Sequence, residues 1–193
     1  MNQAWIKSVL FSLGTAFGGL HAIAADAPTA ADKGATAIFA GGCFWCTESD
    51  FEKVPGVIAA ESGYTGGKKT NPTYEEVSAG GTGHTEAVRV TYDPARVNYA
   101  QLVEYFWHTI DPTVRNRQFC DVGSQYRSAI FWQTEEERTI AERSRDALLA
   151  SGRFKEIQTE IVKAGTFYPA EAYHQDYYKN NPHDLALCHG ADL

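Results

Sequence analysis

Residues 37–46 read Ala-Ile-Phe-Ala-Gly-Gly-Cys-Phe-Trp-Cys and join a short apolar run to a stretch of mixed polarity. The apolar run, 37–40, predicts a buried strand, and residues 47–53 predict a helix. The two glycines before Cys43 allow the backbone to turn sharply between these two elements. The sequence therefore predicts a strand, a tight turn and a helix that begins at Cys43.

Cys43 occupies a position where a thiol is easily ionised. Unpaired amide groups and the positive end of the helix dipole favour an anion at a helix start, so we expect Cys43 to tend towards thiolate. Two other interpretations stay open on the spacing alone. Cys43 and Cys46 can be buried small hydrophobic residues, or they can form half of a zinc site, which would need a second ligand pair that the sequence does not show.

The chain has 193 residues, of which 44% are hydrophobic, and this length predicts one domain with one core. Its first 24 residues contain Lys7, a charge-free apolar run and Ala22-Ile23-Ala24. This pattern predicts a secretory signal peptide cleaved after Ala24. An uncleaved membrane anchor is the alternative, but the apolar run is short for a bilayer span.

The remaining chain is divided by composition. Residues 25–35 lack apolar periodicity and are expected to form a flexible lead-in. Residues 36–193 are expected to form the single domain, with an irregular tail from about residue 180. The net charge of −7 argues against non-specific binding to nucleic acid.

Export would place the four cysteines in an oxidising compartment, which we expect to be the periplasm. Two structural disulfides are then the simplest interpretation, and the sequence does not choose among the three possible pairings. The cysteines are Cys43, Cys46, Cys120 and Cys188.

Periodicity predicts the order strand, helix, strand, strand, helix, strand, followed by further helices. Asn98 with Gln101, and Thr134 with Glu137, have the spacing of helix N-terminal caps. The further elements are strands at 57–64, 83–92, 125–132 and 160–163 and helices from 98, from 134 and over 171–179. This order predicts an α+β fold, a ferredoxin-like two-layer sandwich with a mixed sheet, extra helices and an irregular C-terminal tail.

Glu86 alternates with Thr85 and Ala87 so that it shares a face with Val88 and Val90. If this face is the core, burial raises the pKa of the carboxyl group, which suits a proton donor. The alternative is that Glu86 lies near the strand end and pairs with an arginine.

Several separated motifs together resemble one family, the A-type peptide methionine sulfoxide reductases, which act on the S epimer. The resemblance covers nearly all of the chain after the signal peptide. The motifs are Gly42-Cys43-Phe44-Trp45, Gly63-Tyr64-Thr65-Gly66-Gly67, Asn71-Pro72-Thr73-Tyr74, Gly83-His84-Thr85-Glu86-Ala87-Val88, Asp111-Pro112 and Gly123-Ser124-Gln125-Tyr126-Arg127-Ser128.

This resemblance implies a role for each matching residue. Cys43 would attack the sulfoxide sulfur and become a sulfenic acid, and Glu86 would donate the proton to the sulfoxide oxygen. Tyr74 and Tyr126 would hydrogen-bond that oxygen, Asp121 would join the same network, and Phe44 and Trp45 would receive the methyl group. The expected substrates are oxidised proteins and small methionine sulfoxides. No bound cofactor or metal is implied, and an external dithiol such as thioredoxin or a thioredoxin-like protein would supply the electrons.

A second thiol must resolve the sulfenic acid to a disulfide. Cys188 lies in a patternless tail that can reach the site, and Cys46 lies one helical turn from Cys43; these two rank equally. Cys120 follows third. His84, His174 and Asp176 fall in family-like stretches and are interpreted as structural hydrogen-bonding groups.

Two alternatives compete with the repair enzyme. A general thiol-disulfide oxidoreductase would use Cys43 and Cys46 but would leave Glu86, Tyr74 and Tyr126 unexplained. A disulfide-stapled binding domain would contain no thiol with a lowered pKa. We expect a monomer without stable membrane insertion.

Overall fold

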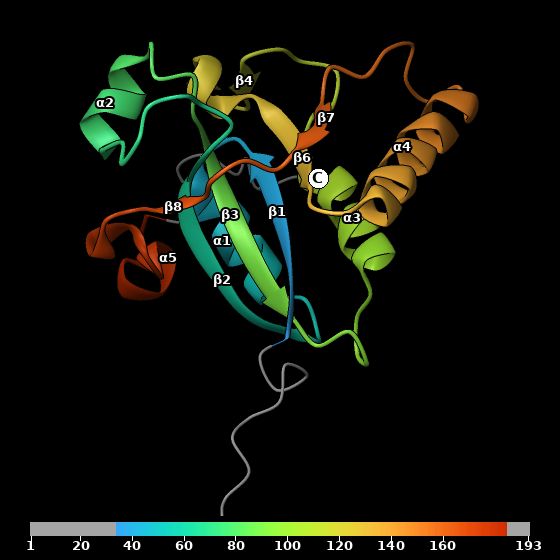
Figure 1. Cartoon of the computed structure of the whole chain (residues 1–193), viewed down its shortest axis with the longest axis horizontal. Helices are drawn as coiled ribbons and strands as arrows, with labels where there is room; N and C mark the ends of the chain where they lie inside the picture. Colours follow the sequence, from blue (N-terminus) through green and yellow to red (C-terminus); the bar gives the residue numbers. More distant parts are fainter. Residues whose placement is uncertain (1–33, 185–193) are drawn as a thin grey trace, which may run out of the picture.

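The computed structural model describes residues 34–184, and its centre is a six-stranded mixed sheet (Figure 1). The strand order is β7-β6-β1-β3-β2-β8, and all neighbours are antiparallel except β6 and β7. The strands are β1 (Ala35–Gly41), β2 (Val57–Thr65), β3 (Thr85–Tyr92), β6 (Ser128–Trp132), β7 (Glu160–Lys163) and β8 (Tyr168–Pro169). The inner order β6-β1-β3-β2 is that of a ferredoxin-like fold, so the predicted fold class is confirmed.

The other elements surround this sheet. The helices are α1 (Phe44–Glu52), α2 (Tyr74–Ala79), α3 (Tyr99–His108), α4 (Glu135–Ala150) and α5 (Tyr177–Asn180). A small hairpin of β4 (Arg117–Gln118) and β5 (Asp121–Val122) and the single turns η2 (Ser124–Tyr126) and η3 (Ala172–His174) complete the described chain. Among residues 34–184, none of the helices has the length and apolar character needed to cross a membrane.

Alternate residues of β1 point to the two faces of the sheet. Phe39 faces the helices, where its ring lies 4.8 Å from Phe51 of α1 and 5.1 Å from Phe106 of α3. Ile38 faces the other side and packs in a smaller cluster with Phe131 and the partly buried Phe167. Figure 1 shows the segment between β7 and β8 crossing the sheet on that side. Both faces are therefore covered, one by helices and one by a crossover segment.

The predicted helix caps are confirmed. Asn98 and Gln101 form a reciprocal capping box at the start of α3, and the Thr134 side chain accepts a hydrogen bond from the amide of Glu137. Helix α2 was not predicted, because its six residues are too few to show a helical period. Its cap, Thr73, was a detectable signal.

Two predicted elements are wrong in extent. The strand predicted over 125–132 begins only at Ser128, because residues 124–126 form the turn η2. The helix predicted over 171–179 is broken at Asp176, whose φ of 52° lies in the left-handed region and separates η3 from α5. The predicted signal peptide and the tail beyond residue 184 lie outside the described residues, as does the lead-in up to residue 33.

Candidate active site

One pocket of about 270 Å³ opens at the start of α1 and brings together all seven residues predicted for catalysis and substrate binding. They come from five elements or the turns beside them, so the fold rather than the local sequence assembles them. The pocket is lined by Cys43, Phe44, Trp45, Tyr74, Glu86, Asp121, Tyr126, Tyr177, Tyr178 and Asp184.

The turn before Cys43 depends on glycine. Gly42 has a φ of 94°, and a Cβ added there would lie 2.6 Å from the side chain of Gln118. Gln118 is itself fixed, because its amide group exchanges two hydrogen bonds with the backbone of Asp111. The strand, the turn and the hairpin therefore fit closely, and Cys43 is held at the N-cap position of α1.

The expectation that Cys43 tends towards thiolate is wrong for this form of the protein. The side-chain hydrogen bond with Cys46 and then burial raise the pKa of the Cys43 thiol, and the negative charges of Cys46 and Glu86 raise it further. Two thiols and a carboxyl group lie together, so a charge on Cys43 is unfavourable there despite the helix N-terminus. These contacts favour the neutral thiol form of Cys43 in this structure.

Glu86 is 2% exposed, and its Oε2 accepts a hydrogen bond of 2.9 Å from the amide of Phe44. Burial raises the pKa of Glu86 to about 8, and the negative charges of Asp121 and Cys46 act in the same direction. Within residues 34–184 no arginine forms an ion pair with Glu86, and Arg89 of the same strand pairs with Glu61. Glu86 therefore holds a proton at neutral pH and can donate it.

Two tyrosine hydroxyl groups can join Glu86 in contacting a bound oxygen. Burial raises the pKa of Tyr74 and of Tyr126, and the charge of Glu86 raises both further, so both phenols stay protonated donors. Asp121 lines the same pocket, and burial followed by the charge of Cys46 raises its pKa. The site is thus rich in protonated groups around an apolar space.

Trp45 is fixed from two sides. Its indole Nε1 donates a hydrogen bond of 3.0 Å to Nδ1 of His174, and its ring stacks on Tyr177 at 3.7 Å between centroids. His174 also lies 5.0 Å from the ring of Phe44. These contacts support the structural interpretation of His174, which holds the aromatic wall in place.

The sequence interpretation missed three pocket residues, Tyr177, Tyr178 and Asp184. The stretch Tyr173-His174-Gln175-Asp176-Tyr177-Tyr178 is rich in aromatic residues, and this was the available signal. The sequence predicts one helix over this stretch, whereas the structure has the turn η3 and the short helix α5 there.

Two further residues interpreted as structural make backbone contacts. His84 accepts from the amide of Gly67 and contacts the carbonyl of Lys69, so it shapes the loop after β2. The amide of Asp176 donates to the buried carboxyl group of Glu48 on α1 at 3.0 Å. Neither side chain is part of the pocket lining.

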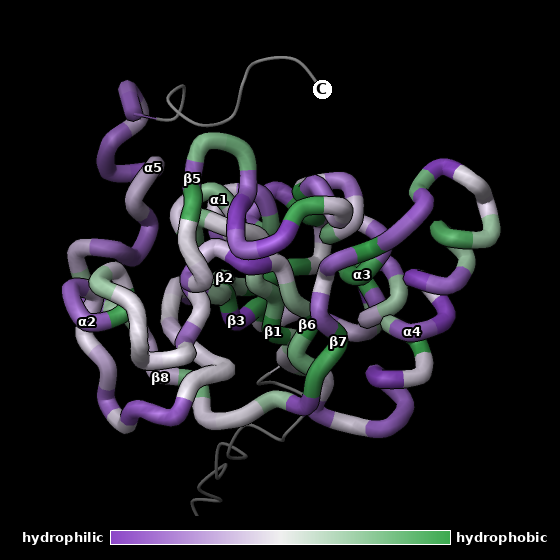
Figure 2. Tube along the Cα trace, turned by 90° about the horizontal axis from the view of Figure 1, so that it is seen from above, coloured by the Kyte–Doolittle hydropathy of each residue, from purple (hydrophilic) through white to green (hydrophobic). Residues whose placement is uncertain are grey.

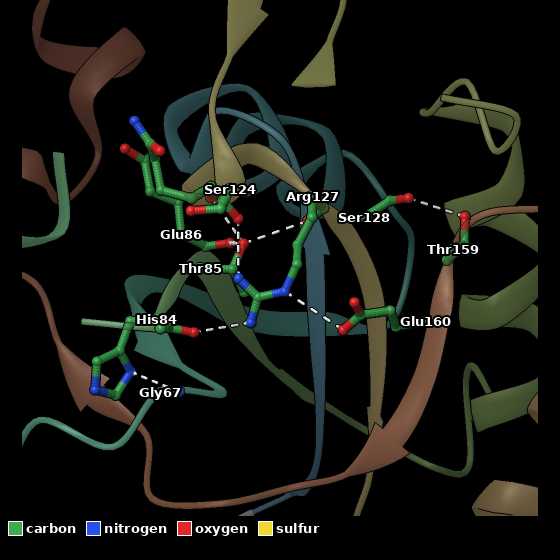
Figure 3. A network of polar contacts seen from close by, with 11 residues as sticks. Gly67, His84, Thr85, Glu86, Ser124, Arg127, Ser128, Thr159 and Glu160 are labelled. Atoms are coloured by element: carbon green, nitrogen blue, oxygen red, sulfur yellow. Dashed lines mark hydrogen bonds and ion pairs between the residues drawn. The ribbon is translucent and has the colours of Figure 1, made fainter. Parts of the chain in front are cut away.

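A polar network lies behind the pocket (Figure 3). The guanidinium group of Arg127 donates to the carbonyls of Ser124 and Gly83, at 2.9 and 3.0 Å, and pairs with Glu160 at 3.4 Å. Arg127 therefore connects η2, which carries Tyr126, to the residues immediately before β3.

The cysteines differ in state. Cys43 and Cys46 are both thiols, and they occupy the N-cap position and the third helical position of α1, whose side chains face each other. Cys120 is disulfide-bonded. Cys188 lies outside the described residues.

Glu48, Glu52 and Asp176 form the group of acidic side chains in residues 34–184 whose oxygens approach closely enough to hold a metal ion. The ammonium group of Lys179 already lies 2.5 Å from Glu52 and 2.6 Å from Asp176. This cluster is an internal ion pair that fixes α5 to α1.

A thiol that shares an apolar pocket with several proton donors is the arrangement of a cysteine-dependent oxidoreductase. Comparison with known proteins gives the family. The family model described as peptide methionine sulfoxide reductase matches residues 35–191. The chain belongs to this family.

Individual proteins similar to this chain belong to the same family. Peptide methionine sulfoxide reductase MsrA of Limosilactobacillus reuteri is 54% identical over 154 residues, which cover 79% of this chain and 88% of the relative. The same enzyme of Listeria innocua is 58% identical over 144 residues, covering 74% and 81%. Methionine sulfoxide reductase A of Corynebacterium diphtheriae has a similar structure, with a TM-score of 0.70, 38% identity and coverage of 82% and 79%.

Proposed function

We propose that this protein reduces methionine sulfoxide in oxidised proteins, and in small substrates, back to methionine, and that it acts on the S epimer. The observation that carries the proposal is the buried, protonated Glu86 beside Cys43 in one apolar pocket. A methionine side chain needs an apolar slot with polar groups only at its S=O end. The membership of the chain in the reductase family supports the same reaction.

In the first step Glu86, with Tyr74 and Tyr126, protonates and holds the sulfoxide oxygen. The sulfur of Cys43 attacks the sulfoxide sulfur, the oxygen is transferred to Cys43 as a hydroxyl group, and the thiol proton of Cys43 passes to the carboxylate that Glu86 has become. The sulfoxide is reduced to methionine by two electrons, and Cys43 is oxidised to a sulfenic acid by the same two electrons. Phe44 and Trp45 receive the methyl group and orient the sulfur.

Cys46 is the proposed resolving thiol, followed by Cys188 and then Cys120. Its side chain already hydrogen-bonds that of Cys43 across the first turn of α1, so a disulfide needs no large rearrangement. Cys120 would have to be reduced before it could attack, because it is disulfide-bonded in this structure. A general thiol-disulfide oxidoreductase would use the same pair, but it would not need Glu86 or the two tyrosines.

An external dithiol is proposed to reopen the disulfide. Mxr1 from Saccharomyces cerevisiae, whose reduced form has a TM-score of 0.73 and 30% identity to this chain, has also been solved in complex with Trx2. A thioredoxin-like protein is the corresponding partner here. No metal or bound cofactor is required by this cycle.

The N-terminal pattern supports export to the periplasm with cleavage after Ala24. We further propose that the product is a monomer. N-terminal sequencing of the protein from a periplasmic extract would check the cleavage site. Recovery of the intact N-terminus in the cytoplasm would contradict this localisation, and light scattering would measure the oligomeric state.

The decisive experiment is stereoselective turnover. The purified protein is mixed with dithiothreitol and each epimer of a blocked methionine sulfoxide, beside a Cys43→Ser variant. We expect reduction of the S epimer alone and its loss in the variant. If folded wild-type protein turned over neither epimer, the proposed function would be wrong, and disulfide substrates would be tested next.

A further inference from the structure

Tyr178 lies against the sulfur of Cys46. Its hydroxyl oxygen is 3.4 Å from Cys46 Sγ, within hydrogen-bonding distance, although 132 positions separate the two residues. Cys46 is only 8% exposed, so little water can solvate a negative charge on its sulfur. A thiolate at this position therefore depends on donors that the protein supplies.

The fold holds α5 against the same helix that carries the cysteine pair. The amide of Asp176 donates to Oε1 of Glu48 at 3.0 Å, and the ammonium group of Lys179 lies 2.5 Å from Glu52. Both acceptors belong to α1. Figure 2 shows α5 at one edge of the molecule, on the side where β5 and α1 lie.

The two consecutive tyrosines of α5, Tyr177 and Tyr178, contact different residues. Tyr177 stacks on Trp45, and its hydroxyl group donates to Asp184 at 3.1 Å. The ring of Tyr178 is turned 74° from that of Tyr177, and its hydroxyl group reaches Cys46 instead. Burial, and then the hydrogen bond to Cys46, raise the pKa of Tyr178, so this phenol keeps its proton and can donate it to a thiolate in a hydrogen bond.

We propose that Tyr178 is a catalytic residue of the recycling step, in which its hydroxyl group donates a hydrogen bond to the Cys46 thiolate that attacks Cys43. This inference rests on the proposed function, in which Cys46 resolves the sulfenic acid. In that step the Cys46 thiol loses its proton, its sulfur forms the S–S bond, and the S–O bond of Cys43 breaks. The departing oxygen takes up a proton and leaves as water, so Cys43 is reduced and Cys46 is oxidised.

The test separates the two steps of a single turnover without external reductant. Wild-type protein and the Tyr178→Phe variant are mixed with the blocked S sulfoxide, and samples are quenched with an alkylating agent. Chromatography measures methionine, and mass spectrometry measures the disulfide and the sulfenic acid trapped by dimedone. Tyr99→Phe is the matched control, because it removes a phenolic hydroxyl group from a residue that does not line the pocket.

Because Tyr178 also lines the pocket, the readout is the ratio of the two steps: we expect Tyr178→Phe to slow disulfide formation at least about tenfold more than it slows methionine formation, the size expected for one lost hydrogen bond to a charged atom. Trapped sulfenic acid should accumulate in this variant alone. A wild-type rate of disulfide formation would overturn the role of Tyr178. Equal slowing of both steps would also overturn it, because that result would mean that α5 had moved as a whole.

The Cys46→Ser variant tests separately whether Cys46 is the resolving thiol, which is part of the proposed function, and whether Tyr178 assists it. If Cys46→Ser still formed an intramolecular disulfide at Cys43, the resolver assignment would be wrong, and the role of Tyr178 would fall with it. If Cys46→Ser formed none while Tyr178→Phe resolved normally, only the role of Tyr178 would be wrong.

Discussion

At the residue scale, the chemistry depends on which groups keep their protons. Glu86 is fully enclosed, and its carboxyl group is neutral at pH 7 because burial disfavours the charged form. A neutral carboxylic acid is a donor for the sulfoxide oxygen, whereas a carboxylate would repel it. The same pocket keeps Cys43 neutral, so attack and proton donation have to be coupled when substrate binds.

This protonation state predicts a pH dependence of the methionine-forming step. Its rate should be constant well below pH 8, fall to half near pH 8 and decrease further above it, because Glu86 loses its proton with a pKa of about 8. Glu86→Gln should be slower by roughly 10²-fold or more and should lose this dependence. Single-turnover rates between pH 5 and 10 measure both. If the rate of Glu86→Gln still fell above pH 8 as the wild-type rate does, the titrating group would be a residue other than Glu86.

Burial of Glu86 also predicts a pH dependence of stability. The pKa is about 8 in the folded protein against an ordinary 4.5, so unfolding releases a proton between these values. The contribution of this group is complete below pH 4.5 and is lost as the pH rises through 8. Urea unfolding of wild type and Glu86→Gln at pH 5 and pH 8 measures it. The variant should gain stability relative to wild type at the higher pH, and an equal difference at both pH values would contradict the burial argument.

At the element scale, short elements are placed by contacts rather than by their own stability. Turn η2 has three residues and carries Tyr126. It is fixed to β3 by the buried hydroxyl group of Thr85, which donates to the carbonyl of Gln125 at 2.7 Å, and by the guanidinium group of Arg127. Tyr126 and Glu86 are thereby held in one relative position, which proximity effects require.

Removing the hydrogen bond from Thr85 to Gln125 should slow catalysis by changing the position of Tyr126. Thr85→Val keeps the shape of the side chain and removes the donor, so we expect the methionine-forming rate to fall about tenfold and stability to fall by about 1–3 kcal/mol. Thr85→Ser restores the donor and should recover most of the rate. Stopped-flow rates and urea unfolding measure the two effects. A destabilised Thr85→Val with the wild-type rate would show that η2 does not need this contact.

At the scale of the whole molecule, the crossover between β7 and β8 covers the second face of the sheet and leads into the segment that closes the pocket. Gly63 of β2 allows this close approach. A Cβ at this position would lie 2.4 Å from the ring of Phe167 and 2.5 Å from the carbonyl of Tyr168. The pairing of Gly63 with Pro169 in β8 depends on the same space.

A side chain at Gly63 should lower the stability of the folded protein. Gly63→Ala should lower the free energy of unfolding by about 1–3 kcal/mol, the range for overpacking in a core. Gly165→Ala is the matched control, because nothing lies within 4 Å of a Cβ added there. Urea unfolding of both variants gives the comparison. Equal stability of Gly63→Ala and wild type would contradict the close packing of the crossover.

The sequence by itself determined the fold class and the order of the main strands and helices, because period and caps are local features, and the motifs that resemble the reductase family indicated the seven pocket residues. It also placed Glu86 on the apolar face of its strand, from which the raised pKa follows. It could not show that the stretch 171–179 breaks at Asp176, because the amide of this left-handed residue donates to Glu48 of α1, a contact that exists only in the folded molecule.

Only the tertiary structure decided what surrounds the two thiols. Cys43 keeps its proton because Cys46, Glu86 and burial act on it together, and these groups are brought together by folding. Tyr178 reaches Cys46 only because α5 is fixed on α1 by contacts more than 120 positions apart in the chain. Charge and proximity are properties of the assembled pocket, and no local pattern in the sequence encodes them.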